Sequence, residues 1–194
     1  SSVLIFTAVI VEGGKDKGIS AFVVESNTKG ISFNPPEKKM GWCASDTRSV
    51  FFKDMQIPKS AILGNPKDGF KQFLQTLTSG RITIGALSLG TAQGAFNRAL
   101  LYSKEREAFG KSINRFQGVS FKLSDMATQI EASKHLVYHV AWMKDQGSPV
   151  IREASMAKLF SSETAMKVTT EAIQVLGGFG YIKEYDVERF FRDA

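Results

Sequence analysis

The feature that most constrains the fold is a long run of apolar residues at three- and four-residue spacing. The run begins near Asp68, with Phe70, Phe73 and Leu74 as its first members, and it continues to about Ser103. This period is typical of one face of an α-helix. A helix of that length is roughly 50 Å long at about 1.5 Å per residue, so the chain must contain a long helical layer.

Two further long helices follow the first. A polar stretch over residues 110–114 breaks the pattern, and a second helix is predicted from about Gln117 to Asp145. A third helix runs to about Leu176, and a short helical piece is predicted at 187–193. Helices this long, joined by so short a hinge, must pack antiparallel, which predicts a helical bundle.

The hinge between the second and third helices carries its own start and stop signals. Gly147 has the residue type that ends helices after the last turn, Ser148 is a good N-cap, and Pro149 suits the first helical position. We therefore expect the third helix to start with Ser148 as its cap and Pro149 in its first turn.

The first 60 residues have the composition of strands and turns. They are rich in β-branched and aromatic residues, and Gly13-Gly14 and a Pro-Pro pair interrupt them. No helical pattern separates the apolar runs, so an antiparallel meander is expected. The predicted strands are Val3–Val11, Ile19–Glu25, Ile31–Pro36 and Ser49–Ile57. The fold class is therefore α+β, an antiparallel β portion followed by an antiparallel helical bundle.

Composition excludes several classes of protein. With 43% hydrophobic residues among 194, the chain is too apolar to be disordered as a whole. The longest apolar run, Val3–Val11, is far shorter than the roughly 20 residues that a membrane helix needs, so no membrane association is expected. The net charge is +6, but the basic residues are scattered and the longest cluster is Lys38-Lys39, which argues against nucleic-acid binding.

Ser1-Ser2 leads straight into an apolar run, which suggests a fragment without a secretory signal.

Metal and nucleophile chemistry have little support. Glu131, His135 and His139 share one helix face, but an ordinary amphipathic helix explains them better than a metal site. Cys43 is the single cysteine, and nothing in the sequence places a base beside it.

Two constellations remain open by the residues alone. Gly177-Gly178-Phe179-Gly180 ends the third helix; one glycine would suffice as a cap, and three suggest close approach of a ligand or a subunit. Arg106 and Phe109, with Gln117, lie at the junction of the first two helices. They are either a phosphate clamp with an aromatic cover or a surface arginine and a hydrophobic plug at a bend.

In their order and spacing, motifs along essentially the whole chain resemble the C-terminal two-thirds of acyl-CoA dehydrogenases. The most specific block begins at Gln174 and continues through the triple glycine to Tyr181. The other matching segments are 39–47, 52–58, 62–64, Gly69-Phe70, Gly80-Arg81, 89–93, Glu105-Arg106, 109–111, Phe116-Gln117, Glu184, Arg189 and Arg192-Asp193-Ala194.

The resemblance implies a domain organisation and a cofactor. Residues 1–62 would be part of the middle β domain, and residues 63–194 would be the C-terminal helical domain, truncated before its last helix. The cofactor would be FAD, bound in part by a neighbouring subunit's residues. The implied FAD contacts are Arg106, Phe109, Gln117, Gln174, Val175, Leu176, Gly177 and Gly178.

The resemblance also implies a substrate site and a catalytic base. Thr78 and Arg81 would lie along the CoA pocket, although many members have Asp where this chain has Thr78. Leu87 would close the floor of a short acyl pocket. Gly80 occupies the position where isovaleryl- and long-chain members carry their catalytic Glu. The catalytic base is therefore expected just beyond Ala194, as in the other members of the family. None of the given residues is expected to serve as the base.

The implied activity is FAD-dependent α,β-dehydrogenation of a short- to medium-chain acyl-CoA in fatty acid β-oxidation. Electrons would pass to electron-transfer flavoprotein. The protein would be a homo-oligomer, a dimer of dimers, in the bacterial cytoplasm or the mitochondrial matrix. The alternatives are an acyl-CoA oxidase or flavin monooxygenase on the same fold, or a fragment that has no catalysis as it stands.

Overall fold

The structure is a computed structural model, and it describes residues 3–194. Those residues form two compact units. One unit, which contains the strands of the N-terminal part, comprises residues 3–39 and 43–77. The other, a helical unit, comprises residues 78–194 together with the short segment Met40–Trp42.

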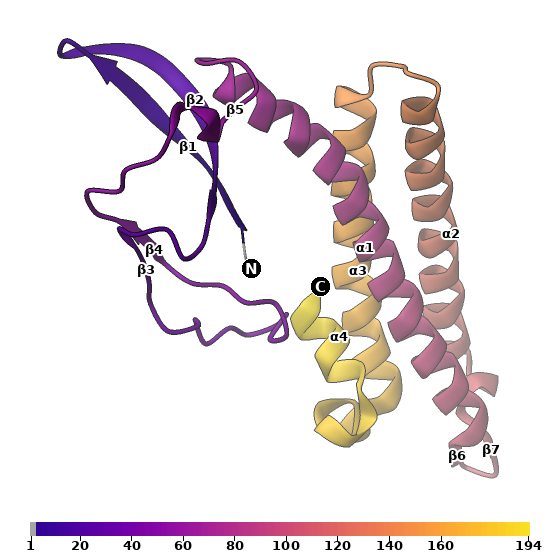
Figure 1. Cartoon of the computed structure of the whole chain (residues 1–194). Coiled ribbons are helices and arrows are strands. Elements are labelled where there is room, and N and C mark those ends of the chain that lie inside the picture. The colour runs from indigo at the N-terminus through magenta and orange to yellow at the C-terminus, as the bar shows by residue number, and fades with distance from the viewer. Residues whose placement is uncertain (1–2) are drawn as a thin grey trace. The chain divides into compact units, whose positions relative to one another are not determined.

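The described strands of the N-terminal unit form two small antiparallel sheets. Strands β1 (Val3–Glu12) and β2 (Lys15–Glu25) make a long hairpin, and β5 (Ile62–Leu63) pairs with the other edge of β2. Strand β3 (Ile31–Phe33) pairs with β4 (Val50–Phe52) in a separate two-stranded sheet. The antiparallel pairing is as predicted, but the single meander is wrong because the strands separate into two sheets (Figure 1).

Turn chemistry explains where these strands begin and end. Gly13 and Gly14 have φ of +57° and +75°, the pair of left-handed residues that a two-residue hairpin turn requires. Strand β3 ends at Phe33, earlier than predicted, because the following prolines, Pro35 and Pro36, have no N–H to donate to a ladder. Strand β4 ends close to Asp54, whose φ of +50° turns the chain away.

Four helices follow, and they match the predicted ranges closely. Helix α1 continues two residues past its predicted end, whereas α2 and α4 have the predicted bounds. The helices are α1 (Gly69–Glu105), α2 (Gln117–Asp145), α3 (Ile151–Leu176) and α4 (Val187–Asp193). Two-residue strands β6 (Glu107–Ala108) and β7 (Lys111–Ser112) form a hairpin between α1 and α2. Single 3₁₀ turns lie at Lys59–Ala61, Ile113–Arg115, Gly177–Tyr181 and Lys183–Tyr185.

The start of α3 differs from the prediction. Val150, not Ser148, occupies the cap position, and no side chain caps the helix. Gly147 ends α2 with φ of +75°, and the Ser148 N–H donates to the Met143 carbonyl at 3.0 Å. Ser148 is therefore part of the ending of α2, and the chain needs two more residues before the buried Val150 enters the core and α3 begins.

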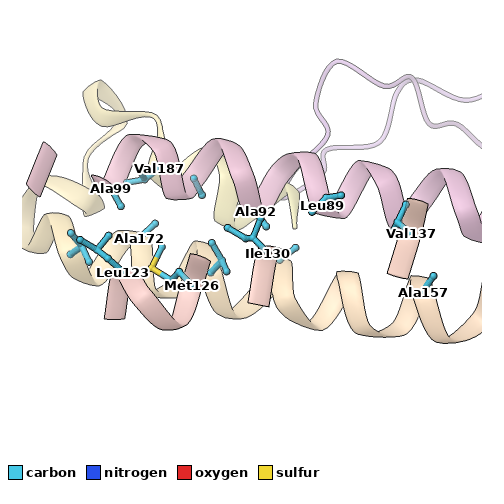
Figure 2. Packing of buried hydrophobic residues seen from close by; sticks show 14 of the residues in the cluster. Leu89, Ala92, Ala99, Leu123, Met126, Ile130, Val137, Ala157, Ala172 and Val187 are labelled. Atoms are coloured by element: carbon cyan, nitrogen blue, oxygen red, sulfur yellow. The ribbon is translucent and has the colours of Figure 1, made fainter. Parts of the chain in front are cut away.

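The core of the helical unit lies between α1, α2 and α3. The buried residues of α2 alternate at three- and four-residue spacing, as in a coiled-coil seam. Those of α3 form a wider buried stripe that includes the adjacent pairs Thr164-Ala165, Val168-Thr169 and Val175-Leu176. On α1 the seam is met by Ala92 and Ala99 (Figure 2). These two residues and Ala95, also in the core cluster, have no exposed surface. Small residues allow the helices to approach closely: a Cβ at Gly85 would be 3.4 Å from the side chain of Val137. Within the described chain no helix has the length and hydropathy of a membrane span.

Candidate functional site

Six of the eight predicted cofactor residues line one groove of about 490 Å³ in the helical unit. The groove lies where the last turn of α3 meets the chain segment that leaves α1. It brings together residues about 70 positions apart in the sequence. The six are Arg106, Gln174, Val175, Leu176, Gly177 and Gly178, and the other lining residues are Tyr102, Ile113, Phe179 and Ile182.

Arg106 has a fixed main chain and an exposed side chain. Its N–H donates to the Tyr102 carbonyl at 2.8 Å, and its carbonyl accepts from the Ile113 N–H at 2.9 Å. The guanidinium carbon lies 5.8 Å from the centroid of the Phe179 ring, within cation–π range. The groove therefore has a positioned, solvent-exposed cation on its wall, the kind of group that binds phosphate.

The three glycines after α3 have three different environments. Gly177 ends the helix with φ of +58°. A Cβ on Gly180 would be 2.5 Å from the Ile173 carbonyl oxygen, so this glycine is required by packing against α3 itself. A Cβ on Gly178 would meet no atom within 4 Å. The expectation that all three mark approach of a ligand or a subunit is thus corrected for Gly180, whereas Gly178 leaves open backbone in the groove.

Aromatic rings of Tyr102 and Phe179 form part of the groove wall, a feature that the residue pattern did not predict. The centroids of Tyr102 and Phe179 are 6.3 Å apart, and Tyr185 lies 5.9 Å from Tyr102 and 5.1 Å from Phe179. Tyr102 precedes Arg106 by four residues, which is the spacing of neighbours on one helix face. This four-residue spacing is the sequence feature from which a position of Tyr102 beside Arg106 could have been predicted.

Phe109 and Gln117 do not line the groove. Phe109 lies at the tip of the β6–β7 hairpin, where it is 96% exposed with φ of +50°, and Gly110 follows with φ of +79°. Phe116 supports its ring from one side, with centroids 6.2 Å apart. Gln117 is the exposed first residue of α2. A large apolar side chain is seldom left almost fully exposed, and phenylalanine seldom has a positive φ. The combination at Phe109 is therefore unusual for a chain that has no partner covering this ring.

The three predicted substrate residues all lie on α1. Thr78 and Arg81 are half-buried and three residues apart, so they are neighbours on one face. Leu87 is exposed and follows Thr78 by nine residues, which is two and a half turns. The helix therefore places Leu87 on the side opposite Thr78.

The carboxyl groups with a clear shift are all shifted towards the ionised form. A hydrogen bond from Arg192, at 2.7 Å, lowers the pKa of Glu188. A bond to its own backbone, followed by one from Arg152, lowers the pKa of Glu153, and Arg48 lowers the pKa of Asp46. A general base for a carbon acid needs a raised pKa, so none of these three groups has the electrostatics of one.

The predicted helix face with the two histidines carries an ion-pair geometry. Glu131 lies 3.2 Å from the Nε2 of His135. Within residues 3–194 no three His, Cys, Asp or Glu side chains gather as metal ligands would.

Comparison with known proteins gives consistent matches. Residues 67–194 match the family described as "Acyl-CoA dehydrogenase, C-terminal domain". A probable acyl-CoA dehydrogenase of Bacillus subtilis is 46% identical over 192 residues, which are 98% of this chain and 50% of that protein. The chain thus spans about half the length of such relatives.

Solved structures match over the whole chain. Butyryl-CoA dehydrogenase from Megasphaera elsdenii has a TM-score of 0.94 at 42% identity, covering 100% of this chain and 50% of that one. A structure of the electron transferring flavoprotein of Acidaminococcus fermentans also gives 0.94, at 44% identity, covering 99% and 50%.

Proposed function

The chain belongs to the acyl-CoA dehydrogenase family, and from this premise we propose that it is part of an FAD-dependent enzyme that dehydrogenates a short- to medium-chain acyl-CoA. Electrons would pass to electron-transfer flavoprotein, in the bacterial cytoplasm or the mitochondrial matrix. The observation that carries the proposal is the groove, where six residues predicted to contact FAD lie together. The butyryl-CoA dehydrogenase and the electron transferring flavoprotein among the similar structures support the substrate class and the acceptor.

The groove has the groups that a dinucleotide needs. Arg106 offers an exposed guanidinium for the pyrophosphate, and the open backbone of Gly177 and Gly178 allows close approach. Phe179 and Tyr102 offer flat apolar surface beside the cation. FAD, when bound, supplies the electron acceptor of the reaction. The residues of this chain would bind and orient the cofactor, while the buried Val175 and Leu176 fix the end of α3 in the core.

The substrate would lie along α1. Thr78 and Arg81, on one face of α1, would contact the CoA part. Leu87 lies on the side opposite Thr78, so the acyl chain would have to pass round α1 for Leu87 to limit its length. Gly80 has no side chain, and the carboxyl groups with shifted pKa values are held ionised by arginines or backbone. By analogy with the family, we propose that the carboxylate that removes the α-proton lies in the segment that follows Ala194 in the whole protein.

The hairpin tip indicates an assembly. Phe109 is 96% exposed and does not line this chain's own groove. We infer that it covers the cofactor of a neighbouring subunit, which requires at least a dimer and fits a dimer of dimers.

The test compares Arg106→Ala with Arg115→Ala in the full-length protein. Arg115 is an exposed cation nine residues away that does not line the groove. A hydrogen bond to a charged group contributes about 1.5–3 kcal/mol. Arg106→Ala should therefore weaken FAD retention by about 10- to 150-fold, measured by flavin absorbance at about 450 nm, and Arg115→Ala should leave retention unchanged.

Activity is measured on the same preparations with butyryl-CoA and electron-transfer flavoprotein. Turnover that depends on the flavoprotein supports the proposal. Fast reoxidation by air in the product complex would favour the oxidase alternative. A full-length protein without flavin and without turnover would refute the proposal.

A further inference from the structure

The segment Met40–Trp42 is tied to the end of α4, although the two are about 150 positions apart. The Trp42 N–H donates to the Asp193 carboxylate at 2.6 Å, and the Trp42 indole Nε1–H donates to the Asp193 carbonyl at 2.6 Å. The Arg192 guanidinium donates to the Met40 carbonyl at 2.8 Å. Both partners of each bond belong to the helical unit.

Backbone geometry shows that this contact is specified by its residues. A Cβ on Gly41 would fall far inside contact distance of the Arg192 carbonyl, so only glycine fits. Trp42 has φ of +51°, a left-handed conformation that is strained for a residue other than glycine. Such strain persists only where surrounding contacts determine the conformation, and it tends to mark functional segments. Here the three hydrogen bonds to α4 maintain it.

The hydrogen bonds with Met40 and Trp42 hold the last turn of α4 in place. This helix has only seven residues, and its first turn is anchored by Val187, which has no exposed surface. Glu188 holds the Arg192 guanidinium through two bonds, at 2.7 and 3.1 Å, and so orients it towards Met40. The anchor at the first turn and the contact at the last turn leave α4 little freedom to rotate.

We propose that Gly41 and Trp42 form a latch with Arg192 and Asp193 that positions the chain leaving α4 for catalysis. The inference rests on the proposed function, in which the catalytic carboxylate follows Ala194. Trp42 and Asp193 are then positioning residues. A misplacement of about 1 Å at a reacting group can reduce the rate about 100-fold, so an effect on turnover is expected from residues that never touch substrate.

The experiment uses the full-length holoenzyme with Asp193→Ala, Asp193→Asn and Trp42→Phe. Asp193→Ala removes the oxygen that accepts from the Trp42 N–H, whereas Asp193→Asn keeps an acceptor. Trp42→Phe removes the indole donor and keeps a ring. Arg189→Gln is the matched control, because Arg189 lies on the same helix and pairs with Asp186 at 3.5 Å outside the latch. The readouts are kcat, KM, FAD content and amide hydrogen exchange of residues 187–194.

Asp193→Ala should lower kcat by about 10- to 100-fold, with KM and FAD content unchanged and faster exchange in α4. Asp193→Asn should restore kcat to within about threefold of wild type. Trp42→Phe should have an intermediate effect, and Arg189→Gln none.

Three results would overturn the proposal, each in a different way. Unchanged exchange in α4 after Asp193→Ala would show that the latch does not hold the helix. Faster exchange with unchanged kcat would show that the latch does not position the reacting group. A loss of FAD that accounts for the whole loss of kcat would show a structural role only. An inactive wild-type protein refutes the proposed function and the positioning role with it, and the exchange data then still decide whether the latch holds α4.

Discussion

Replacing Gly180 by alanine should damage the groove by a route that can be separated from cofactor contact. The new Cβ would lie 2.5, 2.9 and 3.0 Å from the oxygen, Cα and carbonyl carbon of Ile173. An ordinary contact is about 3.5 Å or more, so one backbone segment must move by up to roughly 1 Å. The Cβ is fixed to the backbone of residue 180, and the atoms that it would meet are backbone atoms of Ile173, so no side-chain rotation can relieve the overlap.

The expected magnitude follows from two opposing effects. Overpacking of this kind costs about 1–3 kcal/mol, and the reduced freedom of alanine in the unfolded chain returns about 0.4–1 kcal/mol. Because the backbone of Ile173 cannot yield easily, the cost should lie near the upper end of that range. The net destabilisation should be about 2 kcal/mol, which corresponds to about a 30-fold increase in local opening. Hydrogen exchange of residues 173–182 in the full-length protein measures this opening directly.

Gly178→Ala is the matched control, two residues away in the same segment. Its Cβ would meet no atom within 4 Å, and its backbone is not left-handed. Exchange should therefore be unchanged, while flavin retention should fall, because the added methyl group occupies space that a bound dinucleotide needs. Equal loss of protection in both variants, or no loss in Gly180→Ala, would refute this assignment of roles.

The remaining predictions concern α1 and α4. Gly94→Ala should increase hydrogen exchange of α4 by up to about 5-fold, because its Cβ would lie 2.7 Å from the outer edge of the Phe190 ring, and the ring must turn or shift to make room. Gly90→Ala meets open space and should stabilise α1 by up to about 1 kcal/mol. Stabilisation by both variants would contradict the packing argument. Hydrogen exchange of α4 should also depend on pH through Glu188, whose pKa is lowered by the hydrogen bond from Arg192. The stabilisation should be complete well above the ordinary pKa of a glutamate and should be lost as the pH falls through the lowered pKa. Glu188→Gln should remove this dependence, and the same acid profile in both proteins would rule the ion pair out as its cause.

Local pattern sufficed for the helices because their signals lie within the elements. The apolar period and the flanking polar or glycine residues defined α2 from Gln117 to Asp145 and α4 from Val187 to Asp193. The start of α3 was missed because Ser148 has two competing uses, and its backbone N–H ends α2 before its side chain can cap the next helix. The sheet order was missed because strand partners are set by long-range packing, which a strand's own sequence does not encode.

The candidate site shows the same division. Only the resemblance to a known family linked Arg106 with Gln174–Gly178, since nothing local connects residues about 70 positions apart. The aromatic wall and the latch join residues far apart in the sequence, so no local pattern predicts them. Gly178 and Gly180 are the same residue type in one short segment, and they differ in the atoms that lie within 4 Å of a Cβ at each position.

The tip of the β6–β7 hairpin has a consequence for engineering this protein. Phe109 and Gly110 both have positive φ, as in the two-residue turn where Asn-Gly is preferred. Asparagine tolerates this backbone better than phenylalanine, so selection for stability of the isolated chain would favour Phe109→Asn. The same change would delete the ring that we infer reaches a neighbouring subunit. At this position a substitution that stabilises the isolated chain would weaken the inferred contact with a neighbouring subunit. A screen based on thermal stability alone would therefore select a residue that impairs assembly.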